Sequence, residues 1–144
     1  MYLYLIAAEN GLIKVGKTAR IRDRVQHIKS SSPIMCELMF FCEYSEEDVK
    51  LEEDLHEQWK YERIKGEWFA LTASDLIDKL GHLDPDFVNL VTLFESWGFF
   101  GRTANYRESY EGIGPFDSVM HRCQAFAAHL TNRRALFYNH NTCN

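Results

Sequence analysis

The most constraining feature of the sequence is a pair of short apolar runs joined by a turn signal within the first 16 residues. Residues 2–8 have the length and composition of a buried strand. Asn10-Gly11 follows, a pair that readily adopts the positive backbone angles of a tight hairpin turn. Residues 12–16 then return as a second strand. The N-terminal segment is therefore predicted to form an antiparallel β-hairpin.

A helix and a third strand are expected next. Thr18 is predicted to cap a helix whose buried stripe consists of Ile21, Val25 and Ile28, at positions i, i+4 and i+7. The polar run that ends at Pro33 should stop this helix. Residues 34–44 are apolar and aromatic, which favours a third strand.

The middle of the chain predicts two further helices. The first should begin at Ser45 and run to about Ile64, with a buried stripe that includes Leu55 and Trp59. Gly66 ends it, and residues 67–71 form a short extended segment. Thr72 or Ser74 should cap the next helix, which runs through residue 80.

The rest of the chain reads as a helical extension. Asp84-Pro85 supplies a cap and a first helical residue, followed by helices over residues 87–97 and 117–138. Hydrophobic content of 46% and aromatic content of 14% are those of a folded protein rather than a disordered one. The predicted fold class is α+β, with a small three-stranded, mainly antiparallel sheet flanked by helices in residues 1–82. Residues 83–144 form a helical extension of unknown role.

Charge is distributed unevenly along the chain. The net charge is −5, yet residues 12–33 contain six Lys or Arg and one acid, whereas residues 37–57 contain nine acids and one Lys. A basic patch beside an acidic helix suits a protein that grips phosphate at one place and holds a cation at another. Two solvated helix faces of opposite sign explain the charges equally well.

Residues 11–18, G-L-I-K-V-G-K-T, also satisfy the formal pattern of a phosphate-binding loop. Such a loop follows a parallel strand and wraps phosphates with free backbone N–H groups. Here the middle of the motif is strand-forming and closes an antiparallel hairpin. Nucleotide hydrolysis is therefore not expected.

Four short motifs resemble those of the GIY-YIG nuclease superfamily. Residues 2–4, Y-L-Y, stand where the family reads G-I-Y, and residues 14–16, K-V-G, stand where it reads Y-I-G. Residues 51–56, L-E-E-D-L-H, resemble the family's L-E-x-x-L-[IH] helix. Residues 66–69, G-E-W-F, match the ending of a branch common in phage and bacterial genomes. The resemblance covers roughly residues 1–81.

The resemblance implies a role for each matching residue. Tyr4 stands at the family's first Tyr, which contacts the nucleophilic water and can act as its base. Lys14 stands where most members have a second Tyr, a departure that some family nucleases share, and would hold phosphate or exchange a proton. Arg24, eight residues after Gly16, matches the phosphate-binding Arg, and Glu52 matches the single metal-ligating carboxylate.

Nearby residues are candidates for supporting roles. His56 lies one helical turn after Glu52 and is expected to orient Glu52 or the water. The implied cofactor is Mg²⁺ or Mn²⁺, because a hard cation takes oxygen ligands and keeps waters, so that one Glu can suffice. Lys17, Arg20 and Arg22 are predicted nucleic-acid contacts along the phosphate backbone. Taken singly, each of these residue types is more commonly structural or solvated.

These residues predict a metal-dependent endonuclease that hydrolyses phosphodiester bonds in nucleic acid, with DNA as the expected substrate. Two alternatives stay open. Lys14 in place of Tyr allows a catalytically inactive nucleic-acid-binding module on the same fold. The acidic balance and the unmatched tail allow a phage-encoded interaction protein. Residues 83–144 would add substrate contacts or a homodimer surface.

A cytoplasmic location without a membrane partner is expected. No apolar run reaches the roughly 18–20 residues of a membrane span, and no signal peptide begins the chain. The four Cys are scattered and form no CxxC pair, which favours reduced thiols. A zinc site built from Cys36, Cys42, His121 and Cys123 is a minor alternative.

Overall fold

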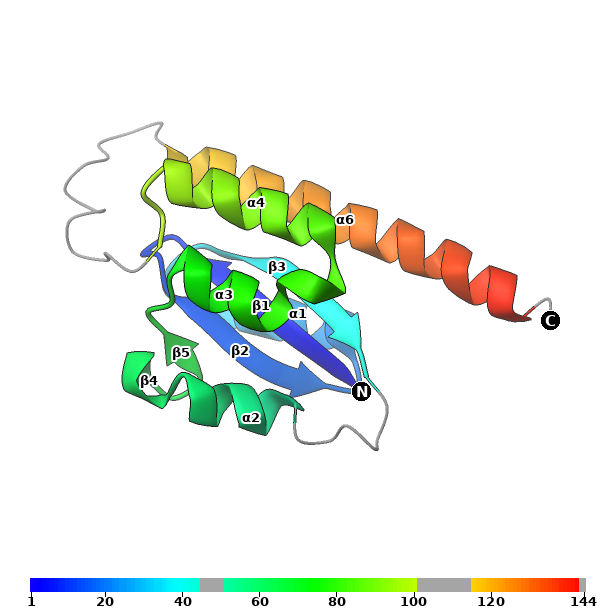
Figure 1. Cartoon of the computed structure of the whole chain (residues 1–144), viewed down its shortest axis with the longest axis horizontal. Coiled ribbons are helices and arrows are strands. Elements are labelled where there is room, and N and C mark those ends of the chain that lie inside the picture. The colour runs from blue at the N-terminus through cyan, green and yellow to red at the C-terminus, as the bar shows by residue number, and fades with distance from the viewer. Residues whose placement is uncertain (45–50, 101–114, 143–144) are drawn as a thin grey trace.

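The computed structural model describes residues 1–44, 51–100 and 115–142, with the side chains of the last helix from 118 to 132. A five-stranded sheet in the order β3-β1-β2-β5-β4 forms its centre, and every strand pair is antiparallel (Figure 1). The strands are β1 (Tyr2–Ala8), β2 (Ile13–Thr18), β3 (Cys36–Glu43), β4 (Arg63–Lys65) and β5 (Trp68–Phe69). The α+β class and the antiparallel sheet are confirmed.

The predicted N-terminal hairpin is present. Gly11 has a φ of +84°, and its N–H donates to the carbonyl of Ala8 at 2.9 Å. Asn10 adds a side-chain acceptor for the N–H of Leu12 at 3.1 Å, which closes the turn locally. Because residues 11–18 lie in this antiparallel pair, they do not form a phosphate-binding loop, as expected.

The prediction of three strands was wrong, since the structure has five. The helix expected to reach Ile64 is α2 (Leu51–Gln58), followed by a single 3₁₀ turn (Lys60–Glu62) and then by β4. The chain turns there because Trp59, only 2% exposed, anchors in the core beside Phe69. Gly66, at a φ of +57°, then joins β4 to β5.

Helix α1 (Ile21–Ser31) begins later than predicted. Its N-cap is Arg20, which makes no side-chain cap bond, so Thr18 is not the cap. The Thr18 hydroxyl instead accepts from the backbone N–H of Arg20 at 3.0 Å, because it lies in the turn before the helix. The predicted start at Ser45 lies outside the described residues.

Other helix starts are confirmed. Helix α3 (Ala73–Leu80) begins with a reciprocal capping box between Thr72 and Asp75. Helix α4 (Pro85–Ser96) begins with Asp84, whose side chain accepts from the Asp86 N–H, and with Pro85 in its first turn. The last helix is α6 (Pro115–Thr142). The residues predicted to face the core from α4 and α6 are all buried in the structure: Leu90, Val91, Phe94, Val119, Cys123, Phe126 and Leu130.

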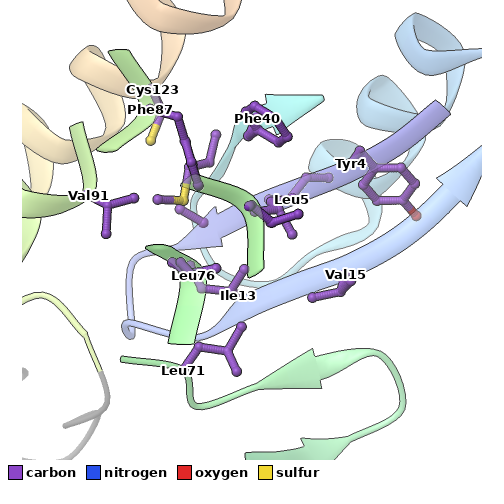
Figure 2. Packing of buried hydrophobic residues seen from close by; sticks show 14 of the residues in the cluster. Tyr4, Leu5, Ile13, Val15, Phe40, Leu71, Leu76, Phe87, Val91 and Cys123 are labelled. Carbon is purple, nitrogen blue, oxygen red and sulfur yellow. The ribbon is translucent and has the colours of Figure 1, made fainter. Parts of the chain in front are cut away.

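Strand alternation divides the sheet into two faces. On one face Leu5 lies opposite Val15 and Phe40, and Phe40 packs against Phe87 of α4 with ring centroids 4.5 Å apart. Figure 2 shows the apolar side chains of this face gathered with those of α3, α4 and α6, including Cys123. This face forms the main hydrophobic core.

The other face carries Tyr2 and Tyr4 and is covered by α1. The predicted stripe of α1 packs against the core, with Ile28 buried and Ile21 and Val25 half-buried. Helix α6 packs along β3, the edge strand of the sheet, so the C-terminal helices share one hydrophobic cluster with residues 1–82. The division into a domain at residues 1–82 and an extension at residues 83–144 stays a prediction.

Candidate nuclease site

Tyr4 and Gly16 face each other across β1 and β2. They are register partners, so their side-chain positions lie on the same face of the sheet, as do those of Ile6 and Lys14. A Cβ placed on Gly16 would overlap the phenol oxygen of Tyr4. The glycine therefore makes the space in which the buried Tyr4 ring lies beside β2, as part of the hydrophobic cluster (Figure 2).

The surroundings keep the Tyr4 phenol protonated. Burial raises the pKa of Tyr4 to about 12, and the nearby carboxylates of Glu67 and Glu52 act in the same direction. The Arg24 guanidinium acts in the opposite direction, which lowers the pKa of Tyr4. Tyr4, Arg24, Glu52 and Glu67 are thus close enough to act on one another electrostatically, although they come from four separate elements or turns.

His56 ties Glu52 to the edge of β2. Its Nε2 lies 2.8 Å from the carbonyl oxygen of Val15 and 2.9 Å from Oε1 of Glu52. A carbonyl oxygen can only accept, so Nε2 carries a proton and donates to both oxygens. His56 therefore links the Glu52 carboxylate to β2, and its role at the site stays a prediction. The edge-on contact with Phe69, at 5.0 Å between centroids, fixes the ring plane.

Glu52 is buried, and its two oxygens have different surroundings in the part of the chain that the structure describes. Its side chain is 9% exposed, and its Oε2 has Lys17 Nζ at 3.9 Å, beyond hydrogen-bond distance. Burial raises the pKa of Glu52, while the neighbouring His56 lowers it and Glu67 raises it further. Lys17 is drawn instead to the exposed Glu53, at 3.4 Å, and this hydrogen bond raises the pKa of Lys17.

The β4–β5 hairpin holds Lys14. Its Nζ lies 3.4 Å from Oε2 of Glu67 and 5.4 Å from the ring centroid of Trp68, its partner in the strand register. The backbone carbonyl of Glu67 also accepts from the N–H of Val15 at 3.0 Å. Sequence reasoning did not select Glu67 as a site residue. Its place in the G-E-W-F motif was the available signal for a site residue.

Basic side chains line an open cleft beside the Tyr4 region. The cleft has a volume of about 720 Å³ and is bordered by Lys17, Arg20 and Arg24, together with Asp23 and His27. Arg20 and Arg24 are one helical turn apart on α1 and are both exposed. Neither forms a salt bridge with a carboxylate in the described part of the chain.

Arg22 does not border this cleft. It lies on the other flank of α1 and lines a separate cavity with residues of β3 and α6. Arginines two residues apart on a helix point about 200° apart, since successive residues turn by roughly 100°. The sequence analysis placed Arg22 with Lys17 and Arg20 as nucleic-acid contacts, although the helical spacing itself separates Arg22 from Arg20 and Arg24.

Tyr44 is a second phenol near the site that sequence reasoning did not select. It follows β3, and its buried hydroxyl has no hydrogen-bond partner in the part of the chain that the structure describes. Burial raises the pKa of Tyr44, while Lys17 lowers it and Glu52 raises it. The sequence offered no signal, because Tyr44 reads as the end of an aromatic strand.

The residues present fit a hard cation held by one carboxylate. Oε1 of Glu52 accepts from His56, whereas the contact of Oε2 within the described ranges is the distant Lys17 ammonium. Mg²⁺ commonly keeps several waters and needs one or two carboxylates, so this single oxygen is sufficient. No group of three or more His, Cys, Asp or Glu side chains that could hold a metal ion occurs among the described residues, which leaves the zinc alternative without support.

A model of the T5orf172 domain matches residues 1–83. The chain belongs to the T5orf172 domain family. The T5orf172 domain is a phage-type, nuclease-related module. The match spans the whole sheet, α1, α2 and α3, so it contains every site residue described above and ends before α4.

Neither the curated proteins nor the solved structures contain a match to the chain. Within the described residues, none of the helices combines the length and the apolar character needed to cross a membrane.

Proposed function

We propose that this T5orf172 protein is a metal-dependent endonuclease of the GIY-YIG type that hydrolyses phosphodiester bonds, with DNA as its substrate. One observation carries the proposal. A buried carboxylate, Glu52, is fixed by His56 to the backbone of β2, next to a strand that carries Tyr4 over Gly16. Burying a carboxylate is unfavourable, and its raised pKa reflects that cost, so a binding role explains its retention better than a structural one.

Tyr4 would position the attacking water. With a pKa of about 12 the phenol stays protonated at neutral pH, so it orients the water through its oxygen and its O–H rather than acting as a preformed phenolate. Its ring cannot move far, since it is buried against Gly16. A fixed phenol keeps the water in one direction of attack, which lowers the entropic part of the barrier.

Arg24 and Lys14 would hold the scissile phosphate. Arg24 is exposed at the cleft and can form two parallel hydrogen bonds with phosphate oxygens. Lys14 is half-buried on the face of the sheet that carries Tyr4, and Glu67 and Trp68 hold its ammonium group there. It would act on the phosphate as a point charge. Lys17 and Arg20 extend the basic surface along the backbone of the nucleic acid.

Glu52 would hold the metal ion through Oε2, while His56 keeps Oε1 in place. When bound, Mg²⁺ or Mn²⁺ would stabilise negative charge on the phosphate and on the leaving oxygen. The ionised form of Glu52 is required for this role. Because burial raises the pKa of Glu52, cleavage should decline on acidification at a higher pH than an exposed glutamate would give.

The test is cleavage of supercoiled plasmid, single-stranded DNA and RNA with Mg²⁺ or Mn²⁺. Glu52→Gln is expected to reduce cleavage by at least about a hundredfold, since removing the interaction with a charged centre typically costs that much. Binding, followed by fluorescence anisotropy, should be retained. Asp54→Asn is the matched control, because Asp54 is an exposed carboxylate two residues away on the same helix. Equal cleavage by wild type and Glu52→Gln would contradict the proposal.

A catalytically inactive nucleic-acid-binding module is the second candidate. The observation that favours it is Lys14, which stands in place of the second Tyr and is engaged in an ion pair with Glu67. This candidate predicts salt-sensitive binding by the wild type without product on any of the three substrates. Absence of both binding and cleavage would favour the interaction protein instead.

A further inference from the structure

A second cavity lies between α1, β3 and α6, on the opposite flank of α1 from the cleft. Its volume is about 450 Å³, within the range of small-molecule sites. Apolar side chains of the sheet and α1 form its floor, and amides and charged groups stand around it. The side chains used below come from β1, β3, α1 and α6: Tyr2, Leu38, Phe41, Arg22, Gln26 and Gln124.

The floor of the cavity is aromatic and aliphatic. Tyr2 and Phe41 meet edge to face, with ring centroids 6.1 Å apart. Phe41 is buried, whereas Tyr2 and Leu38 remain half-buried with surface toward the cavity. An open aromatic surface of this kind suits a planar ring, and base–aromatic stacking tolerates any base.

The polar wall on α1 is one continuous stripe. Arg22, Gln26 and Lys29 recur at i, i+4 and i+7, so they lie along one flank of the helix. Arg22 is exposed and forms no salt bridge with a described carboxylate. Arg24 stands on the opposite flank, at the candidate nuclease site. Helix α1 therefore presents cationic groups toward two separate binding surfaces.

The opposite wall is α6, and it is held in place. Oε1 of Glu37 accepts from Lys29 Nζ at 2.8 Å and from Gln124 Nε2 at 2.7 Å, which links α1, β3 and α6. Ala127 and Thr131 continue this wall along α6. Because the matched T5orf172 domain ends at residue 83, this wall belongs to the part of the chain that the family does not cover.

We propose that this cavity binds one unpaired nucleotide of the substrate strand, with its base on the Tyr2 floor and its phosphate at Arg22. Three features together favour a nucleotide. The floor offers stacking surface, the Gln26 and Gln124 amides offer both donors and acceptors to a base edge, and Arg22 offers a cation without a carboxylate partner among the described residues. The negative charge of Glu37 is countered by Lys29. The inference rests on the proposed function for its ligand, nucleic acid.

Binding of a labelled single-stranded oligonucleotide and of its duplex, both by anisotropy, tests the inference. Ala127→Trp fills the cavity from α6, and Ala128→Trp is the matched control on an exposed position of the same helix. Ala127→Trp should lower the ratio of single-strand to duplex affinity about tenfold, as expected for the loss of one stacked base. Arg22→Gln should weaken single-strand binding and reduce its salt slope by roughly 0.7, the value for one phosphate on a single strand.

The outcomes separate this site from the nuclease site. Wild-type cleavage that depends on Glu52, together with an unchanged affinity ratio in Ala127→Trp and Arg22→Gln, would overturn the nucleotide site alone. A lowered ratio without any metal-dependent cleavage would support the nucleotide site while the nuclease proposal fails. If the wild type binds neither strand form, the nucleotide site is also wrong. Arg22 is exposed, so Arg22→Gln remains informative even if Ala127→Trp does not fold.

Discussion

Two buried carboxylates, Glu37 and Glu52, flank the sheet and are treated differently by their surroundings. Glu37 is 9% exposed and receives short contacts from Lys29 and Gln124, at 2.8 and 2.7 Å. Glu52 is also buried and, among the described residues, receives one short contact, from His56 at 2.9 Å, with Lys17 at 3.9 Å from its other oxygen.

Burial alone therefore does not distinguish a structural carboxylate from a candidate ligand-binding one. Glu37 joins three elements, and its hydrogen bonds to a cation and an amide offset much of the cost of leaving water. Glu52 has less compensation from the described residues, and burial raises its pKa. A carboxylate that is fixed but incompletely satisfied is preorganised for a ligand, whereas Glu37 is a structural link between helices and sheet.

The largest expected effect in this comparison comes from removing His56, which links Glu52 to the backbone of β2. His56→Ala should lower cleavage by about 10–100-fold and raise the half-saturating Mg²⁺ concentration, because the carboxylate loses the donor that orients it. His56→Gln, which keeps an N–H donor, should restore part of both quantities. His82→Ala, at an exposed position, is the control. An unchanged Mg²⁺ requirement in His56→Ala would show that this link is merely structural.

Glu52→Gln removes a buried charge and should stabilise the fold at neutral pH by about 0.5–2 kcal/mol, the range of common stabilising substitutions. Because folding raises the pKa of Glu52, wild-type stability is lost as pH rises through that pKa, and the variant avoids this loss. The gain should therefore shrink toward the ordinary glutamate pKa of 4.5. Urea unfolding at several pH values measures it. A destabilised variant would contradict the comparison.

Glu37→Gln should change the free energy of unfolding in the opposite direction and destabilise the fold. The same isosteric change weakens a charge-assisted contact with Lys29, so we expect a loss of about 0.5–1.5 kcal/mol, reduced by the partial exposure of Lys29. The measurement is urea unfolding under the conditions used for Glu52→Gln. If both substitutions shift the free energy of unfolding in the same direction, the distinction between the two carboxylates fails.

The smallest expected effect comes from removing the ion pair between Glu67 and Lys14. Glu67→Gln removes the ion pair of a lysine whose partner is 42% exposed, so stability should change by less than about 0.5 kcal/mol. Cleavage should change about threefold or less, mainly through KM, because Trp68 still supports Lys14. Single-turnover and steady-state kinetics separate the two constants. A large fall in kcat would instead make Glu67 a direct participant.

Much of the local structure follows from residues near in sequence. Asn10-Gly11 fixes the first turn, and Thr72 with Asp75 begins α3, because these side chains satisfy backbone groups two or three residues away. The alternation of a strand also places Tyr4 and Lys14 on one face, which the register confirms. The site residues themselves were named from their motifs, and their catalytic roles remain predictions.

Other features depend on contacts between distant segments. Strands β4 and β5 are three and two residues long, too short for pattern or periodicity to signal, and they form because Trp59 and Phe69 pack together and β2 offers a free edge. Short strands gain their hydrogen bonds only from neighbours that the tertiary fold supplies. The same dependence explains why the sequence predicted three strands.

The sequence by itself determined the hairpin, the capped helices and the order of the charged motifs, since these depend on periodicity and on local hydrogen bonds. Only the tertiary structure decided the environment of each charge. It gave Glu37 two short contacts and Glu52 one among the described residues, placed Glu67 beside Lys14, and put Arg22 and Arg24 on opposite flanks of α1. The physical reason is that burial and electrostatic interaction depend on distances between segments far apart in the chain.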